Sequence, residues 1–176
     1  MKLVKSTTLV LAVIIAFAPS TTVQAGDVAR GERLIEDRGR ELAFLLAPIK
    51  SKADLDRYLE EVRQNPEART PLNALSPAAR DRFLNSLVFT EHGLGGFYFA
   101  DLEAQLTASQ AYRVLSLFGA QHVTSLLQGA RIESRADEII MENTVAPELP
   151  ADYKDMECVS RATCGPKYNY ICMSSC

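Results

Sequence analysis

The side chains best placed to do chemistry are four cysteines at the end of the chain: Cys158, Cys164, Cys172 and Cys176. The 176-residue sequence contains no other cysteine. A segment typical of an export signal begins the chain, and exported proteins meet an oxidising environment. Two disulfides are therefore the default expectation for these four residues.

The spacing of the cysteines favours a nested pairing without deciding it, because four cysteines can pair in three ways. Residues 165–169, between Cys164 and Cys172, include turn-forming residues, and Tyr168, Tyr170 and Ile171 have strand propensity. A small hairpin with Cys164–Cys172 inside Cys158–Cys176 would satisfy both signals. Each closed loop would stabilise the chain by roughly 2–4 kcal/mol.

A structural zinc site is the competing chemistry for four thiolates. Zinc-binding cysteines usually stand two to four residues apart, and only Cys172 and Cys176 have such spacing. A redox pair is not indicated either, because the segment has no C-x-x-C motif. The sequence thus predicts a structural role for the cysteines, with no metal and no cofactor.

Two histidines, His92 and His122, are the remaining candidates for catalysis or metal binding. His92 follows Glu91, and Asp101 and Glu103 are near enough in sequence for folding to gather them with His122. Neither histidine belongs to an H-E-x-x-H motif, and the chain has no G-x-S-x-G or G-x-G-x-x-G motif. These patterns favour surface histidines on a non-catalytic protein, while an enzyme assembled around His92 or His122 stays an alternative.

Residues 1–25 are predicted to be a cleaved signal peptide. Lys2 and Lys5 precede an apolar run over residues 9–18, and Val23-Gln24-Ala25 suits a signal peptidase. The run is shorter than the roughly 20 residues that cross a bilayer. Cleavage near Ala25 predicts a secreted or periplasmic protein with no stable membrane insertion.

Cleavage would also leave an acidic protein. Removing Lys2 and Lys5 from the 19 basic residues leaves 17 against 22 acidic ones, a net charge of −5. A surface of that sign does not attract nucleic acid or anionic lipid over a distance. A protein or a component of the cell envelope is the expected partner.

The body between signal and cysteines shows helical rather than alternating spacing of apolar residues, so we expect an all-α fold, a compact helical bundle of four to six helices. The first helix should run from Asp27 to Ala47, before Pro48. It should turn five apolar side chains inward: Leu34, Ile35, Leu42, Leu45 and Leu46. Its arginines (Arg30, Arg33, Arg38 and Arg40) interleave with acidic residues, as on a salt-bridged helix surface.

Capping signals mark the later helices. Ser51 with Asp54 begins one helix, Ser76-Pro77 another, and Thr107 with Gln110 forms a capping box for a fourth. Between the last two, residues 91–99 contain three glycines in four positions and are expected to form a loop. The aromatic run 97–99 that ends it is predicted to pack in the core.

The sequence therefore divides into a signal peptide (1–25), a helical domain (26–143), a linker (144–157) and a cysteine-rich tail (158–176) stapled by disulfides. The favoured function is an exported binding or interaction module with a disulfide-stabilised C-terminal segment. One alternative is a precursor that releases a small cysteine-rich peptide, although Lys154 is the sole basic residue at the expected release site. The other is the enzyme described above.

Overall fold

The computed structural model describes residues 25–65, 67–142 and 152–176. The predicted signal peptide, apart from Ala25, and most of the predicted linker lie outside these ranges. Six α-helices and two short 3-10 helices are described: α1 (Ala25–Leu46), α2 (Lys52–Gln64), η1 (Pro71–Ala74), α3 (Pro77–Asn85), α4 (Ala100–Gln105), α5 (Ala108–Ser116), η2 (Gln121–Leu126) and α6 (Arg135–Glu142). Four strands accompany them: β1 (Val88–Thr90), β2 (Gly93–Tyr98), β3 (Tyr153–Ser160) and β4 (Thr163–Cys172).

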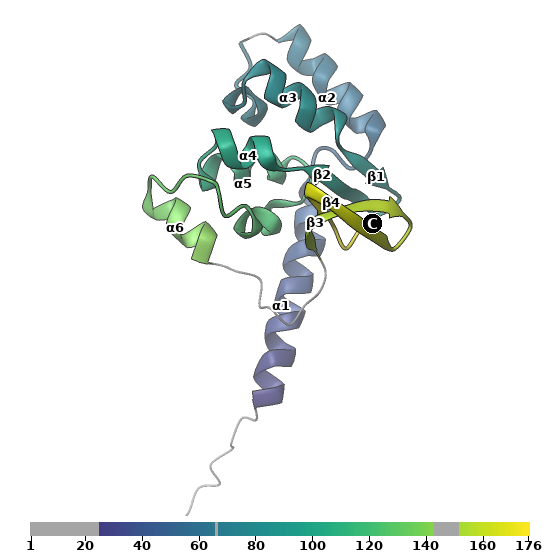
Figure 1. Ribbon diagram of the computed structural model, residues 1–176, viewed down its shortest axis with the longest axis vertical. Helices are drawn as coiled ribbons and strands as arrows, with labels where there is room; N and C mark the ends of the chain where they lie inside the picture. The colour runs from purple at the N-terminus through teal and green to yellow at the C-terminus, as the bar shows by residue number, and fades with distance from the viewer. Residues whose placement is uncertain (1–24, 66, 143–151) are drawn as a thin grey trace, which may run out of the picture.

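The all-α prediction is wrong, because the four strands form one antiparallel sheet in the order β1-β2-β4-β3. The fold is mixed α and β, and in Figure 1 the sheet lies at the right of the body, with α2 and α3 above it and α4, α5 and α6 to its left. The last strand, β4, lies inside the sheet between β2 and β3. The cysteine segment is thus built into the body and is no appendage to a helical bundle.

The glycine-rich stretch that was expected to be a loop forms strand β2, and the missing side chains explain why. A Cβ at Gly96 would lie 2.8 Å from the Ile171 carbonyl oxygen on β4. At Gly95 it would lie 3.0 Å from the Thr90 side chain and 3.4 Å from the Sγ of Cys158. Glycine here permits close approach of backbone and disulfide rather than flexibility.

The expected capping signals begin the helices as predicted. The Ser51 hydroxyl accepts a hydrogen bond from the Asp54 amide at the start of α2. Thr107 and Gln110 form the reciprocal capping box of α5. These caps set the entry of helices whose apolar sides are buried.

One hydrophobic core joins the helices to the sheet. It contains Leu55 of α2, Phe83 of α3, Phe97 of β2, Leu115 of α5 and Ile171 of β4. Phe83 makes edge-to-face contacts with Phe97 and Phe118 at centroid distances of 5.8 Å. Because β4 contributes fully buried Ile171 and Cys172, the body and the cysteine segment share a single core.

Candidate functional site

The cysteines pair as Cys158–Cys176 and Cys164–Cys172, the nested arrangement. Strands β3 and β4 place Cys158 directly opposite Cys164, and the chain end folds back beside them. The sulfurs of Cys164, Cys172 and Cys176 lie within 4.8 Å of one another. Since every cysteine is in a disulfide, the cluster offers no thiolate to a zinc ion in this state.

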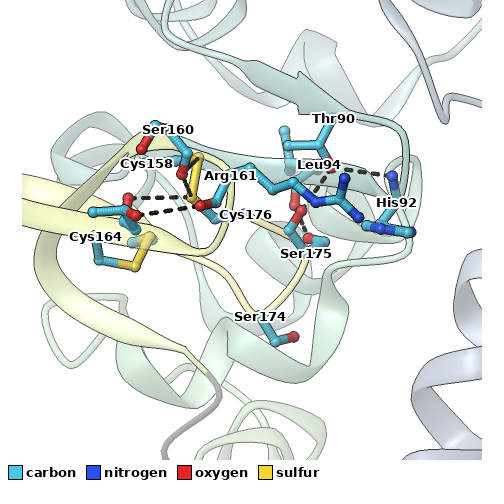
Figure 2. The surroundings of a disulfide bond; sticks show 12 residues. Thr90, His92, Leu94, Cys158, Ser160, Arg161, Cys164, Ser174, Ser175 and Cys176 are labelled. Atoms are coloured by element: carbon cyan, nitrogen blue, oxygen red, sulfur yellow. Dashed lines mark hydrogen bonds between the residues drawn. A yellow bond between two sulfur atoms is a disulfide. The ribbon is translucent and has the colours of Figure 1, made fainter.

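The chain end is hydrogen-bonded to the β1–β2 hairpin (Figure 2). Thr90 donates its hydroxyl to the Ser175 carbonyl at 2.6 Å, and the Ser175 hydroxyl donates to the Leu94 carbonyl. The Met173 amide donates to the Gly95 carbonyl at 2.9 Å. These bonds therefore hold residues 173–175 against β1 and β2, while the outer disulfide ties Cys176 to β3 at the other edge of the sheet.

Folding brings His92 and His122 to the lining of one pocket of about 200 Å³. The sequence alone indicated only that the two histidines could be close together. The pocket lies where the end of α1, the β1–β2 turn, η2 and the chain end meet. Its lining also includes Arg40, Phe44 and Ser174. This pocket is the natural place to look for an active site.

The two ring nitrogens of His122 have different surroundings. His122 Nε2 lies 3.1 Å from a carboxylate oxygen of Asp152, and that side chain is 5% exposed. His122 Nδ1 is buried and has no hydrogen-bond partner among the described residues. Asp152 thus occupies one nitrogen of His122, and burial separates the other from solvent.

Asp152 links two segments of the chain, and we call its pair with His122 the clasp. Its second oxygen accepts the Ser174 amide at 2.8 Å, so one carboxylate joins η2 to the chain end. Burial raises the pKa of Asp152, but the hydrogen bond and the charge of His122 lower it by more. The pKa of Asp152 therefore lies below its ordinary value. Asp152 stays ionised and holds the two segments together. No motif in the sequence predicts this role.

The other predicted site residues are dispersed. His92 is exposed and lies 3.3 Å from Glu91. Asp101 receives a bidentate hydrogen bond from Arg82, at 2.7 and 2.9 Å. Glu103 forms an ion pair with Lys154, whose Nζ lies 2.7 Å from a carboxylate oxygen of Glu103. These acids thus form ion pairs that connect elements, and the proposed gathering of Asp101 and Glu103 with the histidines does not occur.

The aromatic run after the glycines is mostly core, as predicted. Phe97 is fully buried and Phe99 is 2% exposed. Tyr98 faces the other way and meets Tyr170 of β4 at a centroid distance of 5.5 Å. Two residues of the run therefore pack in the core, and Tyr98 lines a surface pocket together with Tyr170.

The prediction that α1 buries its apolar stripe is wrong. The five side chains expected to face inward are all more than half exposed: Leu34 59%, Ile35 74%, Leu42 56%, Leu45 59% and Leu46 74%. With about 100° of rotation per residue, they fall within a sector of about 120° on one side of the helix. Figure 1 shows α1 extending away from the body. We call these five residues the α1 stripe.

The opposite side of α1 makes the contact with the body. Arg40, Ala43 and Phe44 are half-buried and Ala47 is buried. By the same rotation they centre about 170° from the middle of the α1 stripe. A Cβ at Gly119, whose φ is +71°, would lie 2.9 Å from the Phe44 Cα, so glycine permits this close contact. The body itself thus orients the α1 stripe away from the core.

Comparison with known proteins identifies no relative of this chain. No protein-family model, no curated protein and no solved structure matches it. Of the helices in the described ranges, none combines the length and apolar character needed to cross a bilayer.

Proposed function

We propose that this chain is an exported, non-catalytic interaction protein that engages a protein partner through the α1 stripe. The single observation that carries the proposal is the exposure of five large apolar side chains on one side of a 22-residue helix. Contiguous apolar surface of this kind marks sites of association in stable proteins. Helix-in-groove recognition uses anchors at such spacing.

In this proposal the disulfide-linked body holds α1 in a fixed orientation. Helix α1 is fixed by Phe44 against Gly119, and the Ile49 amide donates to the Leu117 carbonyl at 3.0 Å directly after the helix. Ser174 and Ser175 line the same pocket as Arg40 and Phe44 of α1, and the outer disulfide joins the next residue, Cys176, to β3. Disulfides of this kind suit an exported protein that meets no reducing agent.

The enzyme alternative has less support. The buried nitrogen of His122 faces no solvent, and Asp101 and Glu103 pair with Arg82 and Lys154. The pocket is better explained as the junction between α1 and the chain end, with the pair of His122 and Asp152 as its structural clasp.

The precursor alternative also has less support. Releasing the tail before Cys158 would pull β4 out of the sheet and uncover Phe97 beside Ile171. The remaining body would lose part of its only described core. An intact mass equal to that of the full exported chain, with no separate C-terminal peptide, is the expected result.

Site-specific photo-crosslinking tests the proposed function. A photoreactive amino acid replaces Leu42 in the producing cell, and a matched variant carries it at Tyr168, which is 86% exposed on β4. We expect a discrete protein adduct from position 42 and none from position 168. Equal yields from both positions, or no adduct from either, would refute a partner at the α1 stripe.

A further inference from the structure

We propose that the α1 stripe is covered by the α1 stripe of a second copy of this chain, with the two helices antiparallel. The inference rests on the proposed function and names its partner. It follows from the order of charged and apolar residues along the exposed side of α1.

Two opposite charges accompany the apolar residues. Arg38 lies within the sector of the α1 stripe, at about 40° from Leu34, and Glu41 lies just outside it, at about 20° on the other side. Both side chains are exposed. A partner surface must therefore supply apolar contacts along the helix together with an acid for Arg38 and a base for Glu41.

A second copy supplies both in one orientation. A two-fold axis near Gly39 and Arg40 places Leu34 beside Leu45 of the second copy. It places Arg38 beside Glu41 of the second copy, and symmetry repeats each contact. In a parallel pair, Arg38 would face Arg38 and Glu41 would face Glu41, which sets like charges together. These two pairs, one apolar and one charged, are thus matched across the two-fold axis, as an isologous dimer requires.

The α1 stripe is less suited to a membrane surface than to a second copy of the chain. Helix α1 contains four arginines and five acidic residues, a net charge of −1. Helices that lie in membrane interfaces carry an excess of lysine and arginine on the polar side and are attracted to anionic lipid. The charge of α1 provides no such attraction.

Sedimentation velocity of the full exported chain over a range of micromolar concentrations tests the dimer. We expect a concentration-dependent change from one to two copies, and Leu42→Glu should weaken association at least tenfold. Ile132→Glu is the matched control, because Ile132 is 56% exposed outside α1. Arg38→Glu and Glu41→Arg should each weaken association, and the double exchange should restore it. A charge pair in contact predicts that both single changes weaken association, whereas an effect of net charge would give the two single changes opposite signs.

Cysteine crosslinking tests the orientation, since the chain's own cysteines are all in disulfides. Gly39→Cys lies near the proposed axis, in open space. It should form an intermolecular disulfide, whereas Leu34→Cys should not, because antiparallel helices would separate the two copies of residue 34 by about 17 Å. Crosslinking at both positions would indicate a parallel pair and overturn the proposal.

The outcomes separate the inference from the proposed function. A monomer at all concentrations, with a position-42 adduct to a different protein, would overturn the second copy and leave the proposed function intact. A monomer with no adduct at all would overturn both. A position-42 adduct of twice the chain's mass would support both.

Discussion

Replacing Gly96 by alanine gives the sharpest test of the packing between β2 and β4. The added methyl group would lie 2.8 Å from the Ile171 carbonyl oxygen, which belongs to backbone and has no rotamer to relieve the contact. Overpacking of this kind costs about 1–3 kcal/mol. For a chain of this length, each kcal/mol lowers Tm by about 2–4 °C. We expect Gly96→Ala to unfold roughly 2–12 °C below the parent.

Gly39→Ala is the matched control, because it is the same chemical change in open space on an exposed helix. Alanine there should stabilise α1 by about 0.5–1 kcal/mol and leave Tm unchanged or higher. Thermal unfolding followed by circular dichroism measures both variants. If Gly96→Ala unfolded at the parent temperature, or if both changes lowered Tm equally, the close approach of β4 to β2 would be refuted.

Three further outcomes are expected from separate parts of the structure. Replacing Cys164 and Cys172 together by serine should lower the free energy of unfolding by roughly 2–3 kcal/mol in urea titrations, and no loss would contradict a constraining role for the inner disulfide. Hydrogen bonds from Ser109, followed by Ser134, hold the pKa of Asp137 well below its usual value. Its stabilisation should thus be complete above the unfolded-state pKa of about 3.9 and decline as pH falls toward the folded-state value. Asp137→Asn should flatten the dependence of unfolding free energy on pH below about 4, and an unchanged slope would count against this carboxylate. Finally, Arg82→Lys should destabilise the chain slightly, because lysine cannot make the bidentate bond to Asp101 and the exposed arginine is partly screened by water; equal stability in urea would show that the fork geometry is unimportant.

The sequence predicted the local signals of helices well, because capping depends on neighbouring residues. Ser51 and Thr107 begin α2 and α5 as their side chains indicate. The aromatic Phe97 is buried, as its size suggests. Each of these features is decided within a few residues or by a strong burial preference.

The errors concern features that distant residues decide. Gly96 has the local sequence of a loop residue. Its role in β2 depends on Ile171, which lies 75 positions later in the sequence and packs against its backbone. The α1 stripe has the pattern of a buried helix side, but the contact of Phe44 with Gly119 commits the other side to the body. The clasp between His122 and Asp152 joins η2 to the residue that precedes β3, and no local spacing predicts it.

The position of β4 inside the sheet has a consequence for the timing of folding. Strand β2 is made before β4, its inner neighbour, and the residue opposite Phe97 is Ile171, 74 positions later. Domains commonly fold from the N-terminus as the chain emerges, but this sheet cannot close before residues 163–172 are available. The topology therefore leaves one side of β2 without its backbone partner until α4, α5 and α6 have all been synthesised, so the part of the core around Phe97 is completed after the helices that separate the two strands in sequence.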